Sequence, residues 1–353
     1  MNAIDLFCGC GGASLGLKDA GYTVVGAVDN DPIACETYFK NLGLEPICQN
    51  LRLFSGQQIL DNYDLKKGDI DLVVGCPPCQ GFSSLRRTRY SDTTDARKSL
   101  VTVFMKRIEE IRPKAVVFEN VKGIASKQGL QYYLKRFLRK MEKMGYSTNW
   151  KLINASDYGV AQHRKRVFVL AVAGSSKPTF LPETHSSPEK SSTSKIWKTV
   201  RDEIESLPPL GPGEICDSVL NHRARTHSEN VLEIIQHIPK DGGSRRSLPK
   251  RLWLPCHKRL YDKKGRGAES IYGRMTWDKP APTITCRCTT PSSGRFLHPE
   301  QDRAITPREA ARIQSFPDDF EFPTQFSASE KLIGNAVPAE LLKSQLGSFE
   351  GLL

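Results

Sequence analysis

The chain has 353 residues, 39% hydrophobic and 25% charged, which is ordinary for a globular protein large enough to hold two domains. Its 51 basic and 39 acidic residues give a net charge of +12, which favours a polyanionic partner such as nucleic acid. No apolar run approaches the ~18 residues of a membrane span, and the N-terminus lacks a signal-peptide pattern. We therefore expect a cytoplasmic protein whose ten cysteines are reduced.

The first half of the chain alternates short apolar strands with helices. Ala3–Phe7 predicts a strand, which a glycine-rich turn joins to a helix over residues 13–20. The apolar spacing within Lys98–Ile111 predicts one face of a helix. Further strands are expected at Tyr22–Val28, Asp69–Val74, Ala115–Phe118 and Arg166–Ala173, and a further helix at residues 130–141. Such repeated units predict an α/β fold with a doubly wound, mainly parallel sheet.

The composition changes after Gly174. Residues 175–200 are rich in Ser, Thr, Pro and Lys and indicate a linker. From residue 175 to residue 302 there are 21 Lys and Arg against 15 Asp and Glu, and helical patterning is sparse apart from residues 228–237. We expect a separate, smaller domain here, irregular and partly β, before helices resume at residue 306.

The glycine-rich turn Phe7–Gly12 lies between a strand and a helix, where backbone can approach a ligand closely. Asp29 ends the next strand, where a carboxylate could hold a ribose hydroxyl. A nucleoside site shares this geometry, although the glycine spacing is not Gly-x-Gly-x-x-Gly. The turn alone therefore fits either a nucleoside cofactor or a purely structural role.

A stiff loop, Cys76-Pro77-Pro78-Cys79, follows the strand that ends at Val74. Cys-x-x-Cys also occurs in zinc and redox sites. A structural zinc would need a second such pair, and the other close pairs in the chain are Cys-x-Cys. Cys76 extends the strand and suits a buried position, so Cys79 is the better candidate for a nucleophile.

Two polar stretches accompany this loop. Glu119 follows a strand, and parallel strands would bring it to the same sheet edge as the Pro-Pro-Cys loop. Gln162, Arg164 and Arg166 alternate before another strand and would line one side of a cleft, whereas His163 points the other way. A helix cap and a plain basic turn are the simpler interpretations of these stretches.

Taken together, these strings carry a resemblance to the DNA (cytosine-5)-methyltransferases that runs through the chain in order. The matching stretches are Asp5-Leu6-Phe7-Cys8-Gly9-Cys10-Gly11-Gly12, residues 75–83, Asp95-x-Arg97, Glu119-Asn120-Val121, Gln162-x-Arg164-x-Arg166, Arg308-Glu309-Ala310-Ala311-Arg312 and Gly334-Asn335-Ala336-Val337-Pro338. Each string is modest alone, and the ordered set is specific.

The resemblance implies a methyl transfer to C5 of a flipped-out cytosine in a specific short duplex DNA sequence. Cys79 would be the nucleophile that adds to cytosine C6 and makes C5 reactive. Glu119 would hold the ring N3 and the exocyclic amine, and Arg164 would contact the base. No metal is implied.

The implied methyl donor is S-adenosylmethionine, which becomes S-adenosylhomocysteine. The implied cofactor-binding residues are Phe7, Cys10, Gly11, Gly12, Asp29, Asn30, Asn50, Leu51, Pro77, Leu100, Asn335 and Ala336. Asn50 departs from the family, which usually has an acidic residue toward the adenine amine. An amide oxygen still accepts that hydrogen bond, so weaker binding is expected rather than none.

The resemblance also divides the chain and assigns DNA contacts. Residues 1–174 plus 329–353 would form the catalytic domain, with the helix Pro338–Gly347 flanking the first strand. Residues 175–328 would form the target-recognition domain and hinge, in which Thr283 belongs to a short signature. The implied DNA-binding residues are Gln80, Ser83, Arg166 and Thr283.

The expected partner is duplex DNA, with a cognate restriction endonuclease acting separately. We expect a monomer that is associated with the nucleoid of a bacterium or acts for a phage. Two alternatives are an RNA (transfer RNA) cytosine-5 methyltransferase and a non-catalytic, zinc-containing DNA-binding protein.

Overall fold

The computed structural model divides into two compact units. It is described for the whole chain except residues 79–99, 126–129, 191–193, 256–257 and 260–269. Unit 1 comprises Met1–Tyr158, Lys165–Thr184 and Ala336–Leu353, and unit 2 comprises Gly159–Arg164 and His185–Asn335. The domains expected from the sequence, residues 1–174 plus 329–353 and residues 175–328, stay a prediction beside this division into units.

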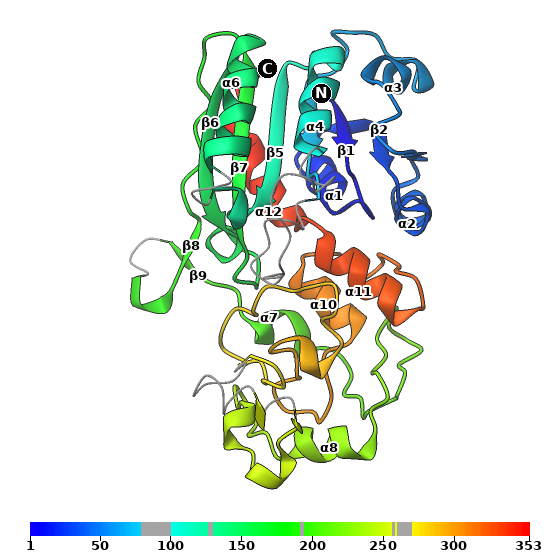
Figure 1. Ribbon diagram of the computed structural model, residues 1–353, viewed down its shortest axis with the longest axis vertical. Coiled ribbons are helices and arrows are strands. Elements are labelled where there is room, and N and C mark those ends of the chain that lie inside the picture. Colours follow the sequence, from blue (N-terminus) through cyan, green and yellow to red (C-terminus); the bar gives the residue numbers. More distant parts are fainter. Residues whose placement is uncertain (79–99, 126–129, 191–193, 256–257, 260–269) are drawn as a thin grey trace. The chain divides into compact units, whose positions relative to one another are not determined.

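A seven-stranded sheet forms the centre of unit 1 (Figure 1). Its order is β3-β2-β1-β4-β5-β7-β6, in which β3 through β5 run parallel while β7 and β6 are antiparallel to their neighbours. The strands are β1 (Asn2–Leu6), β2 (Thr23–Asp29), β3 (Ile47–Cys48), β4 (Leu72–Gly75), β5 (Ala115–Val121), β6 (Tyr146–Asn154) and β7 (Lys165–Ala173). The predicted mainly parallel sheet is confirmed, and β6 is an edge strand that was not predicted.

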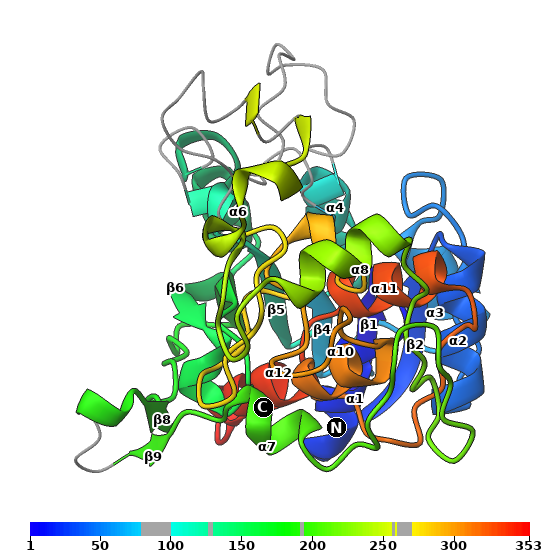
Figure 2. The ribbon, with the colours of Figure 1, turned by 90° about the horizontal axis from the view of Figure 1, so that it is seen from below.

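Helices cover both faces of this sheet. They are α1 (Gly12–Asp19), α2 (Pro32–Leu42), α3 (Gly56–Asn62), α4 (Leu100–Ile111), α6 (Lys135–Lys143) and α12 (Ala339–Leu346). Figures 1 and 2 show α4 and α6 on one face and α1 and α12 on the other. Ala339 of α12 lies against Gly16 of α1, so the C-terminal helix flanks the start of the sheet as expected.

Three buried phenylalanines hold α4 and α6 on the sheet. Phe104 of α4, Phe118 of β5 and Phe137 of α6 are fully buried, with ring centroids 4.5 to 6.1 Å apart. Each large ring removes apolar surface from water, and the offset contacts add to that gain. This packing fixes the position of β5, the strand that carries Glu119.

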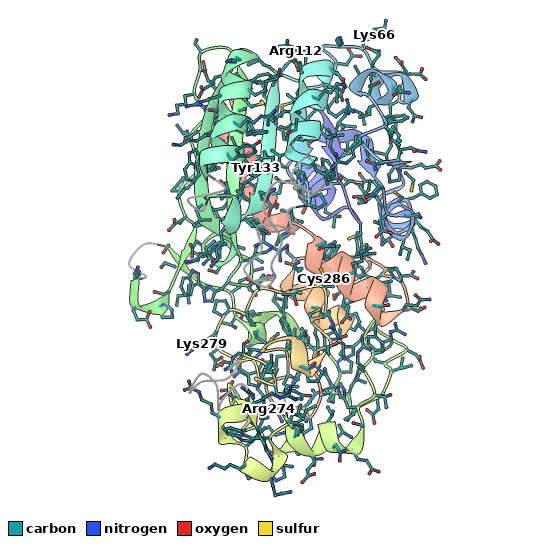
Figure 3. The ribbon with its side chains drawn as sticks, in the orientation of Figure 1. Lys66, Arg112, Tyr133, Arg274, Lys279 and Cys286 are labelled. Carbon is teal, nitrogen blue, oxygen red and sulfur yellow. The ribbon has the colours of Figure 1, made fainter. Side chains whose placement is uncertain are left out.

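Unit 2 is mostly irregular backbone, as predicted. The α-helices and strands in its described residues are β8 (His185–Ser186), β9 (Lys195–Ile196), α7 (Val200–Ile204), α8 (Glu229–Gln236), α10 (Pro307–Ile313) and α11 (Phe326–Asn335). Arg274, labelled in Figure 3, is fully buried and donates to four backbone carbonyls and to the carboxylate of Asp302. A buried guanidinium with five donors can satisfy carbonyls that no helix or strand pairs.

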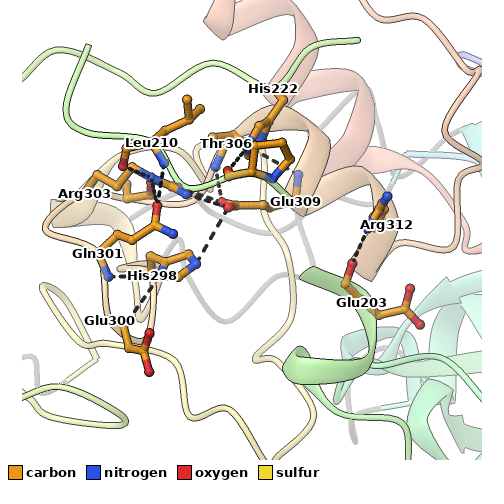
Figure 4. A network of polar contacts seen from close by, with 12 residues as sticks. Glu203, Leu210, His222, His298, Glu300, Gln301, Arg303, Thr306, Glu309 and Arg312 are labelled. Atoms are coloured by element: carbon orange, nitrogen blue, oxygen red, sulfur yellow. Dashed lines mark hydrogen bonds and ion pairs between the residues drawn. The ribbon is translucent and has the colours of Figure 1, made fainter. Parts of the chain in front are cut away.

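A second buried arginine organises the start of α10 (Figure 4). Arg303 forms two hydrogen bonds of 2.8 and 2.7 Å to the carboxylate of Glu309. Thr306 and Glu309 form a capping box on α10, in which each side chain accepts from the other's backbone N–H. Burial alone would raise the pKa of Glu309, but Arg303, together with His298 and the backbone N–H of Thr306, lowers the pKa to about 2.

Candidate active site

The turn between β1 and α1 is shaped by left-handed backbone. Phe7 and Gly11 have φ of 64° and 101°. The N–H groups of Phe7 and Cys8 both donate to Val28 O, which ties the turn to β2. Gly11 adopts a φ that L side chains rarely adopt, and a Cβ there would also crowd Leu42 and Tyr38, so the turn favours glycine. The turn Phe7–Gly12, here called the glycine cradle, lies at the carboxyl end of β1, where open α/β sheets bind ligands.

Asp29, the last residue of β2, stabilises this turn through hydrogen bonds to the backbone. Its Oδ2 accepts from Gly9 N at 2.8 Å and its Oδ1 from Asp31 N at 2.9 Å. Burial raises the pKa of Asp29, opposed by these backbone donors. Cys10 in the same turn is buried, and burial raises the pKa of its thiol to about 12. That thiol is therefore protonated at neutral pH and is no competing nucleophile.

The other residues assigned to the cofactor in this part of unit 1 follow the next strands. Asn30 is exposed after β2. Asn50 is also exposed, and its Oδ1 accepts from Arg52 N at 3.0 Å. Leu51 is buried, and its carbonyl accepts two hydrogen bonds from Arg107. Leu100 is partly buried at the first residue of α4.

The entry to the Pro-Pro-Cys loop is anchored to β5. Pro77 is buried, and its carbonyl accepts from Asn120 Nδ2 at 3.2 Å. Asn120 directly follows Glu119, so one strand end places both the carboxylate and the start of the loop. Cys79, Gln80 and Ser83 lie outside the described residues.

Glu119 is paired with Arg166. Arg166 Nε lies 2.9 Å from Glu119 Oε1, and the two side chains are 13% and 9% exposed. The pair forms because β7 runs antiparallel beside β5, with Arg166 opposite Val121. Alternation along the chain could not reveal this partner, since it depends on which strand neighbours β5.

Arg164 makes two hydrogen bonds within unit 2. Its guanidinium is buried and donates to Ile284 O at 3.1 Å and to Gly334 O at 3.2 Å. Gln162 is also buried, while His163 is exposed, as the alternation predicted. Thr283 is partly buried, and its hydroxyl donates to His163 O at 2.7 Å.

Asn335 ends α11 and is exposed, and Ala336, the first residue of the return to unit 1, is partly buried. The thiol of Cys286, labelled in Figure 3, donates to Asn335 Oδ1 at 3.0 Å. The sequence motifs gave Cys286 no role beyond its Cys-x-Cys spacing from Cys288, and it lies 49 residues from Asn335 along the chain. Among the described residues, no three His, Cys, Asp or Glu side chains gather as a metal site would require.

Unit 1 thus gathers its candidate site at one edge of the sheet. The carboxyl ends of β1, β2, β4 and β5 carry the glycine cradle, Asp29, the Pro77 loop entry and Glu119. Arg164, Thr283 and Asn335 lie in unit 2. None of the helices in the described ranges has both the length and the apolar character that a membrane crossing needs.

Comparison with known proteins identifies the family. The model of the C-5 cytosine-specific DNA methylases matches residues 1–349. The type II methylase M.HgiDII of Herpetosiphon aurantiacus is 36% identical over 96% of this chain and 92% of its own. The type II methyltransferase M1.HphI of Haemophilus parahaemolyticus is 34% identical over 98% of this chain and 85% of its own.

Solved structures share the fold. A protein described as a DNA modification methyltransferase encoded within an E. coli prophage matches with a TM-score of 0.75 at 24% identity, covering 100% of this chain and 99% of that one. The S. pombe Dnmt2 methyltransferase matches with a TM-score of 0.63 at 17% identity, over 100% and 99% of the two chains. The family match decides for an enzyme acting on DNA over the RNA and non-catalytic alternatives, and the chain belongs to the C-5 cytosine-specific DNA methylases.

Proposed function

We propose that this enzyme methylates C5 of a flipped-out cytosine in a specific short duplex DNA sequence, through a covalent bond between Cys79 and C6. The main support is the way in which Asn120 and Glu119, adjacent residues of β5, are held. Asn120 anchors the carbonyl of Pro77, two residues before Cys79, while the adjacent Glu119 is held by Arg166. The end of β5 therefore sets the origin of the nucleophile's loop and the position of the carboxylate together.

The reaction assigned to these groups begins at C6 of the cytosine ring. The Cys79 thiolate adds to C6, and N3 receives a proton on the Glu119 side, so that C5 becomes an enamine carbon. C5 then forms a bond to the methyl group while the bond between that methyl group and the donor's sulfur breaks, with its electron pair left on sulfur. Loss of the C5 proton to a water molecule, departure of Cys79 from C6 as the thiolate and return of the N3 proton to the Glu119 side restore the aromatic ring. Flipping the base exposes C6 for this addition and costs a few kcal/mol.

S-Adenosylmethionine would supply a methyl group activated by its positively charged sulfur, leaving S-adenosylhomocysteine. The glycine cradle and Asp29 fit a nucleoside, because they lie at the carboxyl ends of the neighbouring parallel strands β1 and β2 and Asp29 is fixed by two backbone donors. Asn30, Asn50 and Leu51 would complete the adenosine side. Phe7, Cys10, Gly12, Pro77, Leu100, Asn335 and Ala336 would complete the binding set.

DNA contacts are assigned to Gln80, Ser83, Arg166 and Thr283 and to the basic surface of unit 2. Lys250, Lys258 and Arg259 are exposed and carry charge suited to phosphates. The protein would act as a monomer at the nucleoid of a bacterium or a phage-infected cell. As the relatives are type II methylases, a separate restriction endonuclease would share its target.

Methyl transfer to duplex DNA tests the proposal. Tritiated S-adenosylmethionine should label duplex DNA, and bisulfite sequencing of DNA from cells expressing the protein should show one modified sequence. Cys79→Ser should abolish labelling while retaining S-adenosylhomocysteine binding. Glu119→Gln should lower the rate without a comparable loss of DNA affinity. Full turnover by Cys79→Ser would overturn the assigned mechanism.

A further inference from the structure

The end of α11 is held by side chains from distant parts of unit 2. Gln314 Nε2 donates to Ile333 O at 2.5 Å, and Arg164 Nη2 donates to Gly334 O at 3.2 Å. The last carbonyls of a helix have no partner within the helix, so these donors satisfy groups that would otherwise need water. The orientation of the last residue, Asn335, is thereby restricted.

The segment that contains Cys286 packs directly on this helix end. A Cβ on Gly334 would lie 2.3 Å from the carbonyl carbon of Thr285 and 2.4 Å from Cys286 N. Only glycine permits this approach of the two backbones. Arg164 also donates to Ile284 O at 3.1 Å, so one guanidinium joins the two segments.

The close packing of the two backbones at Gly334 places the Cys286 thiol beside the side chain of Asn335. Sγ lies 3.0 Å from Oδ1, the amide oxygen. Burial raises the pKa of Cys286 although Arg164 opposes the shift, so the thiol is protonated and can donate at neutral pH. A thiol bound to the amide oxygen fixes the amide plane and directs the Nδ2 donors away from Cys286.

We propose that Cys286 is a positioning residue for the methyl donor, because it orients Asn335 so that its amide N–H groups donate to that molecule. This inference rests on the proposed function, in which Asn335 contributes to the S-adenosylmethionine site. Cys286 itself would touch neither the donor nor DNA. A hydroxyl at residue 286 would serve equally well, whereas an apolar side chain of the same size would not.

The test compares Cys286→Ser, Cys286→Val and Asn335→Ala in the full chain. The dissociation constant of S-adenosylhomocysteine is measured by calorimetry, with Cys216→Ser as the cysteine control. Cys286→Val should weaken binding roughly five-fold, the equivalent of one ordinary hydrogen bond, and Cys286→Ser should bind like the parent. In turnover, Cys286→Val should raise KM for the donor and leave KM for DNA and kcat unchanged.

A double variant separates positioning from a general packing effect. Once Asn335 is alanine, adding Cys286→Val should cause no further loss of affinity. If Cys286→Val does not fold, as judged by its thermal transition, Cys286→Ala takes its place in both comparisons.

Three outcomes are distinguishable. Parent affinity in Cys286→Val together with weak binding by Asn335→Ala would overturn the role of Cys286 alone. Parent affinity in Asn335→Ala would overturn the assignment of Asn335 to the donor. No binding of S-adenosylhomocysteine by the unmodified protein would overturn the proposed cofactor.

Discussion

Arg166 Nε lies 2.9 Å from Oε1 of Glu119, across the antiparallel pair β5 and β7. The sequence resemblance assigned contact with the flipped base to Arg164 and contact with DNA to Arg166. Within the described residues of unit 1, Arg166 contacts the carboxylate, and within unit 2 Arg164 donates to the carbonyls of Ile284 and Gly334. Substitutions of Arg164 and Arg166 should therefore have different effects on methylation and on donor binding.

Arg166→Ala should lower the single-turnover rate of methylation on the order of 10²-fold at saturating DNA and donor, because Glu119 loses the group that orients it. Affinity for S-adenosylhomocysteine should stay unchanged. Arg164→Ala provides the contrast, since its carbonyl partners flank Asn335 and its loss should weaken donor binding. An unchanged single-turnover rate in Arg166→Ala would contradict this role.

Asn120→Ala should slow formation of the covalent complex. The substitution removes the hydrogen bond to Pro77 O, and the entry to the Cys79 loop loses its anchor on β5. A loss of roughly 1 kcal/mol of positioning corresponds to about a five-fold slower single-turnover rate. Quenched-flow methylation measures it, and donor affinity serves as the control. Parent kinetics would show that the anchor is dispensable.

Asp5 beneath the glycine cradle should make stability depend on pH. It is buried and accepts from Ser14 Oγ at 2.7 Å, and burial raises its pKa from 3.8 to about 7. Folding favours the protonated form of Asp5, because its pKa is raised in the folded protein. The contribution of Asp5 to the free energy of unfolding is therefore greatest below pH 4 and falls as the pH rises toward 7. The difference is on the order of 4 kcal/mol.

Asp5→Asn should remove that contribution from the free energy of unfolding, measured by urea titration between pH 4 and 8. The variant should gain stability relative to the parent as pH rises. A constant difference between the two proteins across this range would show that Asp5 does not titrate as burial predicts.

Removal of either partner of the buried ion pair between Arg303 and Glu309 should lower the free energy of unfolding. Glu309→Gln would leave a fully buried guanidinium without its carboxylate, at a cost of roughly 3–5 kcal/mol. The matched control is Asp318→Asn, which breaks the pair between the exposed Asp318 and the partly buried Arg312 and should cost about 1 kcal/mol. Urea unfolding compares them, and similar losses in both would argue against the buried network as an organiser of unit 2.

The basic surface of unit 2 should govern the salt dependence of DNA binding. Lys250→Ala and Lys258→Ala should each reduce the slope of log K against log salt by about one for a phosphate contact. Lys66, an exposed lysine before β4 in unit 1, is the control (Figure 3). An unchanged slope in the unit 2 variants would place the phosphate contacts elsewhere.

The parts of the site that could be predicted from the sequence are short motifs at the ends of strands. The glycine turn follows β1, and Asp29 and Glu119 lie near the carboxyl ends of β2 and β5, so their common sheet edge follows from parallel pairing. Gln162 and Arg164 are buried and His163 is exposed, as the alternation required.

The remainder depends on contacts between distant residues. The pairing of Arg166 with Glu119 follows from the placement of β7 beside β5, which no local pattern encodes. The edge strand β6 exposes Trp150 and Leu152, so it lacks the apolar run that marked the inner strands. The link between Cys286 and Asn335 likewise arises only from the backbone approach at Gly334.

The most direct test of the central claim uses a duplex containing 5-fluorocytosine at the target position, because fluorine cannot leave C5 as a proton. With S-adenosylmethionine present, the parent should form a covalent complex, and mass spectrometry of its peptides should locate the bond at Cys79. Cys79→Ser should form none. The same complex in Cys79→Ser, or attachment at Cys76, would contradict the assignment of Cys79 as the nucleophile.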